Sequence, residues 1–129
     1  MVVADVRVLV VDDQQPFREA AAAVLLATEG FALVGSAIDG PSSLAAVERL
    51  RPDLVLMDVN LPGMDGLEAT RRIRAAGASP AVVLVSTYAL GDLGADPLAA
   101  GADAYVTKAD FDSECLRSLL TIVRRRTQG

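Results

Sequence analysis

Residues 53–63 read DLVLMDVNLPG, an apolar run that ends at Asp58 just before a proline-glycine turn. Consecutive apolar residues are typical of a strand that is buried on both faces, as at the centre of a parallel sheet. Ligands of open α/β sheets bind outside the carboxyl ends of the strands, which is where Asp58 would lie. Asp58 is therefore a candidate functional residue, although an aspartate at this position can also simply cap the turn that follows.

Strand-like and helix-like segments alternate along the whole chain. Short apolar runs predict four more strands, at residues 6–11, 31–37, 81–86 and 102–107. The run at 31–37 is the least uniformly apolar, so we expect it at an edge of the sheet. Between the runs, apolar residues recur at helical spacing, beginning with Phe17 on the buried face of the first helix. This alternation predicts βα units around a parallel sheet, which is an α/β fold.

Capping residues and helix breakers indicate where the helices begin and end. Asp65, followed three residues later by Glu68, resembles a capping box, and Asp110 is expected to cap one continuous last helix. Residues 89–101 encode a helix poorly because Gly91, Gly94 and Pro97 interrupt them. Only a short helix at 97–100 is expected there, within an otherwise irregular segment.

The composition limits the class of protein. The chain has 129 residues, of which 52% are hydrophobic and 22% are charged, as in a domain with a substantial core. We expect one domain over residues 1–129, with its core at about 6–123 and a basic tail or the start of a linker at 124–129. A formal net charge of -5 argues against direct binding of nucleic acid by this chain.

Three absences narrow the location and the chemistry. No apolar run approaches the length that spans a membrane, so no membrane association is expected. Cys115 is the single cysteine, which excludes an internal disulfide and favours the reducing cytoplasm. The chain has no histidine, so it lacks the commonest general base and the usual phosphohistidine carrier. Its chemistry must therefore use carboxylates, hydroxyls and lysine.

Polar side chains stand at four of the five predicted strand ends. They are Asp12, Asp13, Asp58, Ser86 and Lys108. Because the carboxyl ends of parallel strands meet at one edge, these groups should converge. Carboxylates in one crevice repel each other, and Mg²⁺, with Mn²⁺ as an alternative, relieves that repulsion. We expect Asp13, Asp58 and the backbone carbonyl of Asn60 to bind the ion directly, and Asp12 to contact it through water.

The same groups suit phosphoryl transfer to a carboxylate, which needs positioning and neutralisation of charge more than covalent chemistry. Asp58 would be the nucleophile and would become an aspartyl phosphate. The metal would neutralise one phosphoryl oxygen, the ammonium of Lys108 a second, and the hydroxyl of Ser86 with nearby backbone N–H groups the third.

In order and spacing, these residues resemble the receiver domains of bacterial two-component response regulators, from about residue 6 to residue 123. Residues 8–13 look like the acidic pair of that family, residues 53–66 like its phosphoacceptor segment, and residues 101–108 like the segment that carries its lysine. The resemblance implies a flavodoxin-like fold, a doubly wound five-stranded parallel sheet of order 2-1-3-4-5 with helices on both faces.

The resemblance also implies switch residues and partners. Ser86 falls at the family's Thr/Ser switch position, and Tyr105 at its aromatic switch position. A sensor histidine kinase or a phosphotransfer protein is the implied phosphoryl donor, and a homodimer formed on phosphorylation is a further partner. Residues 66–74 look like those of receivers attached to a LuxR-type helix-turn-helix output. The receiver portion of a longer transcription factor is therefore expected, with a stand-alone regulator as the alternative.

Two positions depart from the family pattern. Ala109 follows Lys108 where the family often has a proline in a cis peptide, so the isomer of that peptide stays open. Thr87 follows the switch hydroxyl where the family usually has a smaller residue, and its methyl group is expected to narrow access to the acceptor.

Two other functions compete with a phosphoacceptor receiver. A phosphatase of the haloacid-dehalogenase type also forms an aspartyl phosphate, but it has a second acid where this chain has Asn60. A degenerate receiver that acts only as a protein-interaction module should have lost an acid, the acceptor or the lysine, and this chain keeps them all. We therefore expect the chain to catalyse only its own phosphorylation and dephosphorylation, not to act as an enzyme on other substrates.

Overall fold

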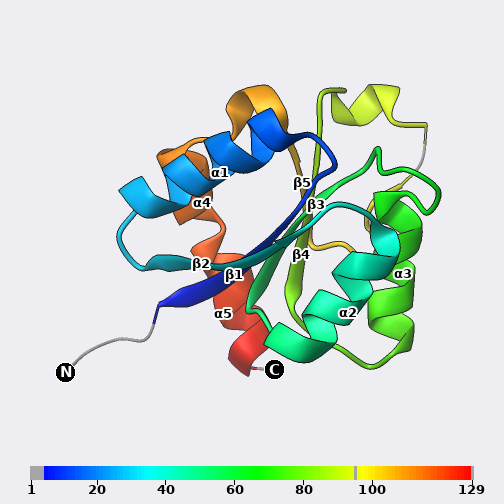
Figure 1. Ribbon diagram of the computed structural model, residues 1–129, viewed down its shortest axis with the longest axis horizontal. Coiled ribbons are helices and arrows are strands. Elements are labelled where there is room, and N and C mark those ends of the chain that lie inside the picture. Colours follow the sequence, from blue (N-terminus) through cyan, green and yellow to red (C-terminus); the bar gives the residue numbers. More distant parts are fainter. Residues whose placement is uncertain (1–4, 95, 129) are drawn as a thin grey trace.

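A computed structural model of the chain shows one parallel sheet with helices on both of its faces (Figure 1). It describes residues 5–94 and 96–128. The strands are Val6–Val11 (β1), Phe31–Ala37 (β2), Leu54–Asp58 (β3), Ala81–Ser86 (β4) and Ala104–Thr107 (β5). All neighbouring strands are parallel, and the order β2-β1-β3-β4-β5 confirms the flavodoxin-like topology implied by the family resemblance.

The helices divide between the two faces of this sheet. They are Gln15–Ala27 (α1), Gly40–Leu50 (α2), Gly66–Ala75 (α3), Ser113–Ser118 (α4) and Leu120–Gln128 (α5), with two short 3₁₀ helices at Leu90–Asp92 (η1) and Lys108–Asp110 (η2). In Figure 1, α1, α4 and α5 cover one face of the sheet, and α2 and α3 cover the other. Both faces of the central strands are therefore closed to water.

Alternate residues of each central strand enter two separate apolar cores. Val8 and Val10 pack in the core that contains α1 and α4 residues, whereas Leu9 and Val11 pack in the core that contains α2 and α3 residues. Every residue of β3 and β4 is buried. Burial on both faces explains why residues 54–57 form an uninterrupted apolar run, which alternation with polar residues would break.

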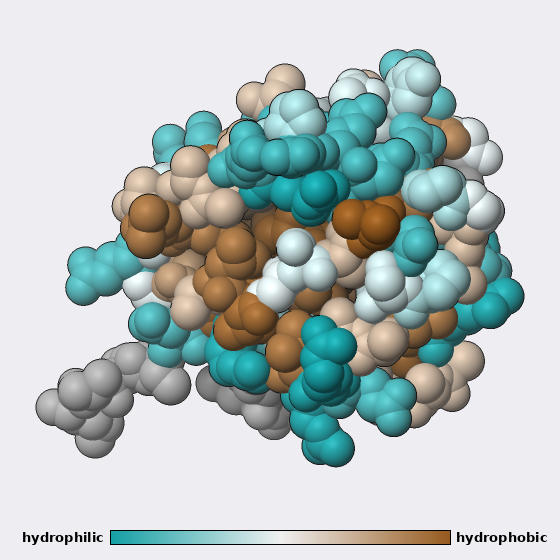
Figure 2. Space-filling model, in the orientation of Figure 1, coloured by the Kyte–Doolittle hydropathy of each residue, from teal (hydrophilic) through white to brown (hydrophobic). Residues whose placement is uncertain are grey.

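The face shown in Figure 2 carries apolar side chains over the region of β2 and α1, among polar residues elsewhere. Leu26 on α1 is 91% exposed, and Leu33 on the edge strand β2 is 42% exposed. The placement of β2 at the sheet edge is as the sequence predicted.

The end of the chain differs from the prediction in three ways. Asp110 does not cap the helix that follows it: Asp112 caps α4, accepting a hydrogen bond of 2.8 Å from the N–H of Cys115. The reason is that Lys108–Asp110 form η2, where the Asp110 carboxylate accepts a hydrogen bond from the hydroxyl of Thr107 instead. The predicted single helix is divided at Leu119 into α4 and α5, and β5 begins at residue 104 rather than 102.

Two further predictions concern short segments. Asp65 caps α3 by accepting a 2.8 Å hydrogen bond from the N–H of Glu68, but the Glu68 side chain pairs with Arg71 and Arg72 and does not complete a capping box. Residues 97–100 form a hydrogen-bonded turn rather than the predicted short helix. The irregular character expected of 89–101 is seen on both sides of residue 95, which lies outside the described residues.

Asp103 connects α3, β4 and α5 at the amino ends of the strands, the end of the sheet opposite Asp12 and Asp58. Its Oδ2 accepts hydrogen bonds from Nη2 of Arg74 at 3.0 Å and from the N–H of Val82 at 2.9 Å. Its Oδ1 pairs with Arg126 of α5 at 2.9 Å. These partly buried ion pairs fasten α3 and α5 to the sheet, so Arg126 has a structural partner and is not only part of a basic tail.

Gly66 is the first residue of α3, where the chain passes close to the backbone of Asp58. A Cβ at this position would lie 2.1 Å from the Asp58 carbonyl oxygen. We expect Gly66→Ala to lower the free energy of unfolding by roughly 1–3 kcal/mol because the backbone must shift to relieve the clash. Gly91→Ala is the matched control because a Cβ there meets no atom within 4 Å. Urea unfolding checks this, and equal stability of the two variants would contradict it.

Candidate functional site

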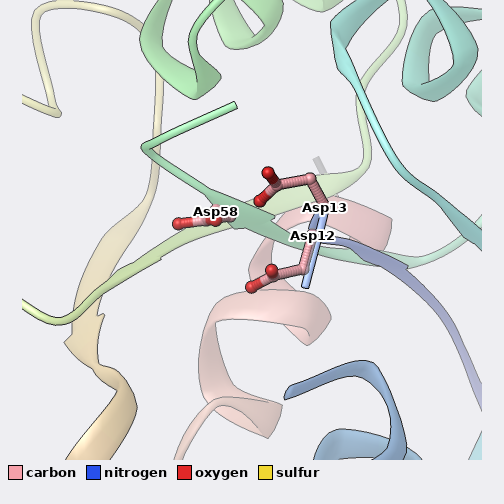
Figure 3. A group of neighbouring side chains, drawn as sticks. All are labelled: Asp12, Asp13 and Asp58. Carbon is pink, nitrogen blue, oxygen red and sulfur yellow. The ribbon is translucent and has the colours of Figure 1, made fainter. Parts of the chain in front are cut away.

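Three carboxylates lie together at the carboxyl edge of the sheet (Figure 3). Asp12 and Asp13 directly follow β1, and Asp58 is the last residue of the neighbouring strand β3. Each contributes an oxygen within 4.8 Å of the oxygens of the other two. Asp12 and Asp58 are buried, whereas Asp13 is exposed. The predicted convergence of these acids is therefore present, and one acid faces solvent.

Asp12 is held in place through its backbone and its side chain. Its N–H donates to the carbonyl of Ala37 at 3.0 Å, which extends the β1–β2 ladder by one residue. Its Oδ1 accepts a 2.8 Å hydrogen bond from the N–H of Gln14, and its carbonyl accepts one from Nη1 of Arg18. Nζ of Lys108 lies 2.8 Å from Asp12 Oδ2, an ion pair that is not aligned as a hydrogen bond.

The Asp58 carboxylate has longer polar contacts than that of Asp12, although it is only 4% exposed. Its Oδ1 accepts a hydrogen bond of 3.2 Å from the N–H of Asn60, and its Oδ2 lies 3.6 Å from Nζ of Lys108. Burial, and next the negative charge of Asp12, raise the pKa of Asp58 to about 6 against the opposing effect of Lys108. An ionised Asp58 is thus costly in the metal-free protein.

This pKa gives the stability of the metal-free protein a definite pH dependence. Because the pKa of Asp58 is about 6 when folded and 3.8 ordinarily, the folded state binds the proton more tightly than the unfolded chain. The contribution of Asp58 to the free energy of unfolding is therefore complete below about pH 4 and is lost as the pH rises through about 6. We expect the stability advantage of Asp58→Asn over wild type to grow across this window. Urea unfolding at several pH values, without divalent ions, measures it, and a constant difference would contradict the raised pKa.

The acid cluster fits a hard divalent cation. Asp12 Oδ2 is buried and accepts no hydrogen bond within the described part of the chain, and the ammonium of Lys108, 2.8 Å away, is its charged partner. Oxygen ligands are what Mg²⁺ prefers, and it usually takes one or two carboxylates and keeps several waters. The exposed Asp13 leaves such a site open to solvent.

The predicted switch residues both hold the backbone of Tyr88, just beyond β4. The fully buried Oγ of Ser86 accepts a hydrogen bond of 3.2 Å from the N–H of Tyr88. The hydroxyl of Tyr105 donates a hydrogen bond to the carbonyl oxygen of the same residue. Thr87, which lies between Ser86 and Tyr88 in the sequence, is exposed. No peptide bond in the described residues is cis, so the Lys108–Ala109 peptide is trans.

Phe17 is the residue of this site that sequence reasoning assigned only to packing. Nζ of Lys108 lies 4.7 Å from the centroid of the Phe17 ring, a cation–π distance. The signal that could have suggested this is its position on the first turn of α1, directly after the acidic pair. Helical spacing alone does not show what the outer side of the ring contacts.

Comparison with known proteins agrees with this fold and identifies the family. The response regulator receiver domain family matches residues 8–121. A protein-glutamate methylesterase/protein-glutamine glutaminase from a Nocardioides species is 44% identical over 107 residues, covering 80% of this chain and 29% of that protein. The response regulator GacA of Pseudomonas viridiflava is 38% identical over 114 residues, covering 88% of this chain and 53% of GacA.

A solved two-component response regulator of the LuxR family, from an Aurantimonas species, superposes with a TM-score of 0.86 at 29% identity. The match covers 95% of this chain and 88% of that one. The chain thus belongs to the response regulator receiver domain family, and it is a receiver domain of two-component signalling.

The chain spans about half or less of the length of the curated relatives just described. Receiver domains interact with histidine kinases or phosphotransfer proteins. No helix in residues 5–94 and 96–128 is long and apolar enough to cross a membrane.

Proposed function

We propose that Asp58 accepts a phosphoryl group from a sensor histidine kinase or a phosphotransfer protein, and that the phosphorylated domain then changes conformation to control an output. The observation that supports this most is the position of Lys108. Its ammonium lies 2.8 Å from Asp12 and 3.6 Å from Asp58, at the edge where the three acids converge. A cation that contacts both buried carboxylates suits a site that must stabilise additional negative charge.

The residues of the chain account for the transfer step. The ionised carboxylate of Asp58 attacks phosphorus, the phosphorus bond to the donor atom breaks, and the donor leaves with that electron pair. No proton has to leave Asp58 above its pKa of about 6. Lys108 then pairs with a phosphoryl oxygen, and the hydroxyl of Ser86 donates to another.

A magnesium or manganese ion would be held by Asp13, Asp58 and the backbone carbonyl of Asn60, with Asp12 acting through water. Bound there, the ion would offset the repulsion among the acids and neutralise charge on a phosphoryl oxygen. What supports this is the cluster of carboxylate oxygens within 4.8 Å of one another, together with the exposure of Asp13 to solvent.

The conformational change would begin at Ser86. Movement of its hydroxyl toward the phosphoryl group pulls on the N–H of Tyr88, and Tyr105 repacks when the carbonyl of Tyr88 moves. The chain would act in the cytoplasm as a single receiver domain over residues 1–129. The likeness to a LuxR-family regulator supports an output in transcription, reached through another part of a longer protein and a homodimer formed on phosphorylation.

Labelling with acetyl phosphate and Mg²⁺ tests the proposal. We expect one phosphoryl group per chain on the peptide that contains Asp58, and its loss in hydroxylamine or base, because an aspartyl phosphate is an acyl phosphate. Continuous release of phosphate over many turnovers would favour a phosphatase. Absence of label would favour a receiver that acts only by binding.

A further inference from the structure

The ammonium of Lys108 has an aromatic neighbour in addition to its two acids. Nζ lies 4.7 Å from the centroid of the Phe17 ring, 2.8 Å from Asp12 Oδ2 and 3.6 Å from Asp58 Oδ2. The Lys108 side chain is only 13% exposed, so water replaces few of these contacts. The ring therefore occupies part of the space in which the ammonium would otherwise be hydrated.

The Phe17 ring is held in place by the ring of Phe111. Its centroid lies 6.1 Å from that of Phe111, with 54° between the ring planes, a tilted aromatic pair. Phe111 is 8% exposed and belongs to the apolar core beneath α1. Pro16 at the start of α1 further restricts the backbone next to Phe17. These contacts restrict the movement of the Phe17 ring, so its face stays next to the Lys108 ammonium.

Before phosphorylation the ammonium is closer to Asp12 than to the acceptor, although phosphoryl transfer needs it beside Asp58. Attraction of a cation to a ring face is broad in direction, unlike an ion pair with a single oxygen. It can therefore hold the ammonium while the charge moves from Asp12 toward a phosphoryl oxygen. A purely apolar side chain of similar size would fill the space but would not attract the charge.

From this arrangement, and resting on the proposed phosphorylation of Asp58, we propose that Phe17 is a positioning residue whose ring face keeps the Lys108 ammonium between Asp12 and Asp58, within reach of the incoming phosphoryl group. Phe17 does not touch the reacting atoms and acts only through Lys108.

Fluorination of the ring tests this because it weakens the negative face with little change in size. Phe17 is replaced in the full chain by 4-fluoro-, 3,5-difluoro- and 3,4,5-trifluorophenylalanine. The rate constant for labelling of Asp58 by acetyl phosphate is measured at saturating Mg²⁺. We expect a stepwise fall that reaches roughly three- to thirty-fold, the range that corresponds to loss of a cation–π contact. Phe17→Leu should be as slow as the trifluoro variant, and Phe17→Tyr, which keeps the ring face, should be close to wild type.

Phe31 on β2 provides the matched control because it is 7% exposed and packs in the same core. Trifluorination there should leave the rate unchanged. An unchanged labelling rate across the fluorinated Phe17 variants, or an equal fall in that rate when Phe31 is fluorinated, would overturn the inference. Labelling of Asp58 in the wild type would still uphold the proposed function. A wild-type chain that takes no label on Asp58 would contradict the proposed function, and this inference with it.

Discussion

Asp58→Ala is expected to abolish labelling by acetyl phosphate, because it removes the buried acid with the longer contacts, 3.2 Å to the N–H of Asn60 and 3.6 Å to Nζ of Lys108, which is the freer one to attack phosphorus. Asp12 is equally buried, but its Oδ1 is hydrogen-bonded to Gln14 and its Oδ2 is paired with Lys108 at 2.8 Å. Mass spectrometry of the intact chain after incubation with Mg²⁺ and acetyl phosphate measures the label. A phosphorylated Asp58→Ala protein would contradict the assignment of the acceptor.

The same variant should remain folded, although the position of Asp58 at the end of β3 does not place its side chain on the surface. Asp58 is only 4% exposed. Its charge is poorly compensated, since burial and Asp12 raise its pKa to about 6. We expect the isosteric Asp58→Asn to raise the free energy of unfolding at pH 7.5 by roughly 1–2 kcal/mol, allowing for screening at the solvent-facing edge. Asp58→Ala gains less because it also leaves a small cavity.

Asp13→Ala should weaken the binding of Mg²⁺ by at least about tenfold, the lower limit seen when even outer groups around a metal site are removed. Asp13 is the exposed member of the acid cluster, so an ion entering from solvent meets it first. Isothermal titration calorimetry with MgCl₂ measures the affinity. The same substitution should stabilise the metal-free protein slightly by removing repulsion from Asp12 and Asp58.

Asp92→Ala is the matched control for Asp13→Ala. It removes the same formal charge from an exposed position in η1, outside the acid cluster. Its affinity for Mg²⁺ should equal that of the wild type. If Asp13→Ala binds Mg²⁺ as tightly as Asp92→Ala, the ion does not sit among these acids.

The sheet and the acid cluster could be predicted because their signals are local in the sequence. A strand buried on both faces needs consecutive apolar residues, and its carboxyl end is where the run stops, so Asp58 and Asp12 could be placed without a structure. Lys108 could be placed for the same reason, since it follows β5 directly.

The sequence does not predict a contact when a side chain has several possible partners nearby. Asp110 and Asp112 are both plausible caps, and only the hydrogen bond from Thr107 to Asp110 decides between them. The ring of Phe17 could face the core or a charge, because helical spacing fixes its direction only approximately. The pairing of Asp103 with Arg74 and Arg126 spans more than 20 residues in each case and has no local signal.

In the unphosphorylated domain, Ser86 and Tyr105 both form hydrogen bonds with the backbone of Tyr88. The N–H and the carbonyl of Tyr88 are held by these two hydroxyls, and each such hydrogen bond is worth roughly 1 kcal/mol net. Release of both would cost about 2 kcal/mol, which leaves a few per cent of molecules rearranged at any moment. On the proposed mechanism, the unphosphorylated domain therefore has a basal output, and phosphorylation amplifies a population that already exists.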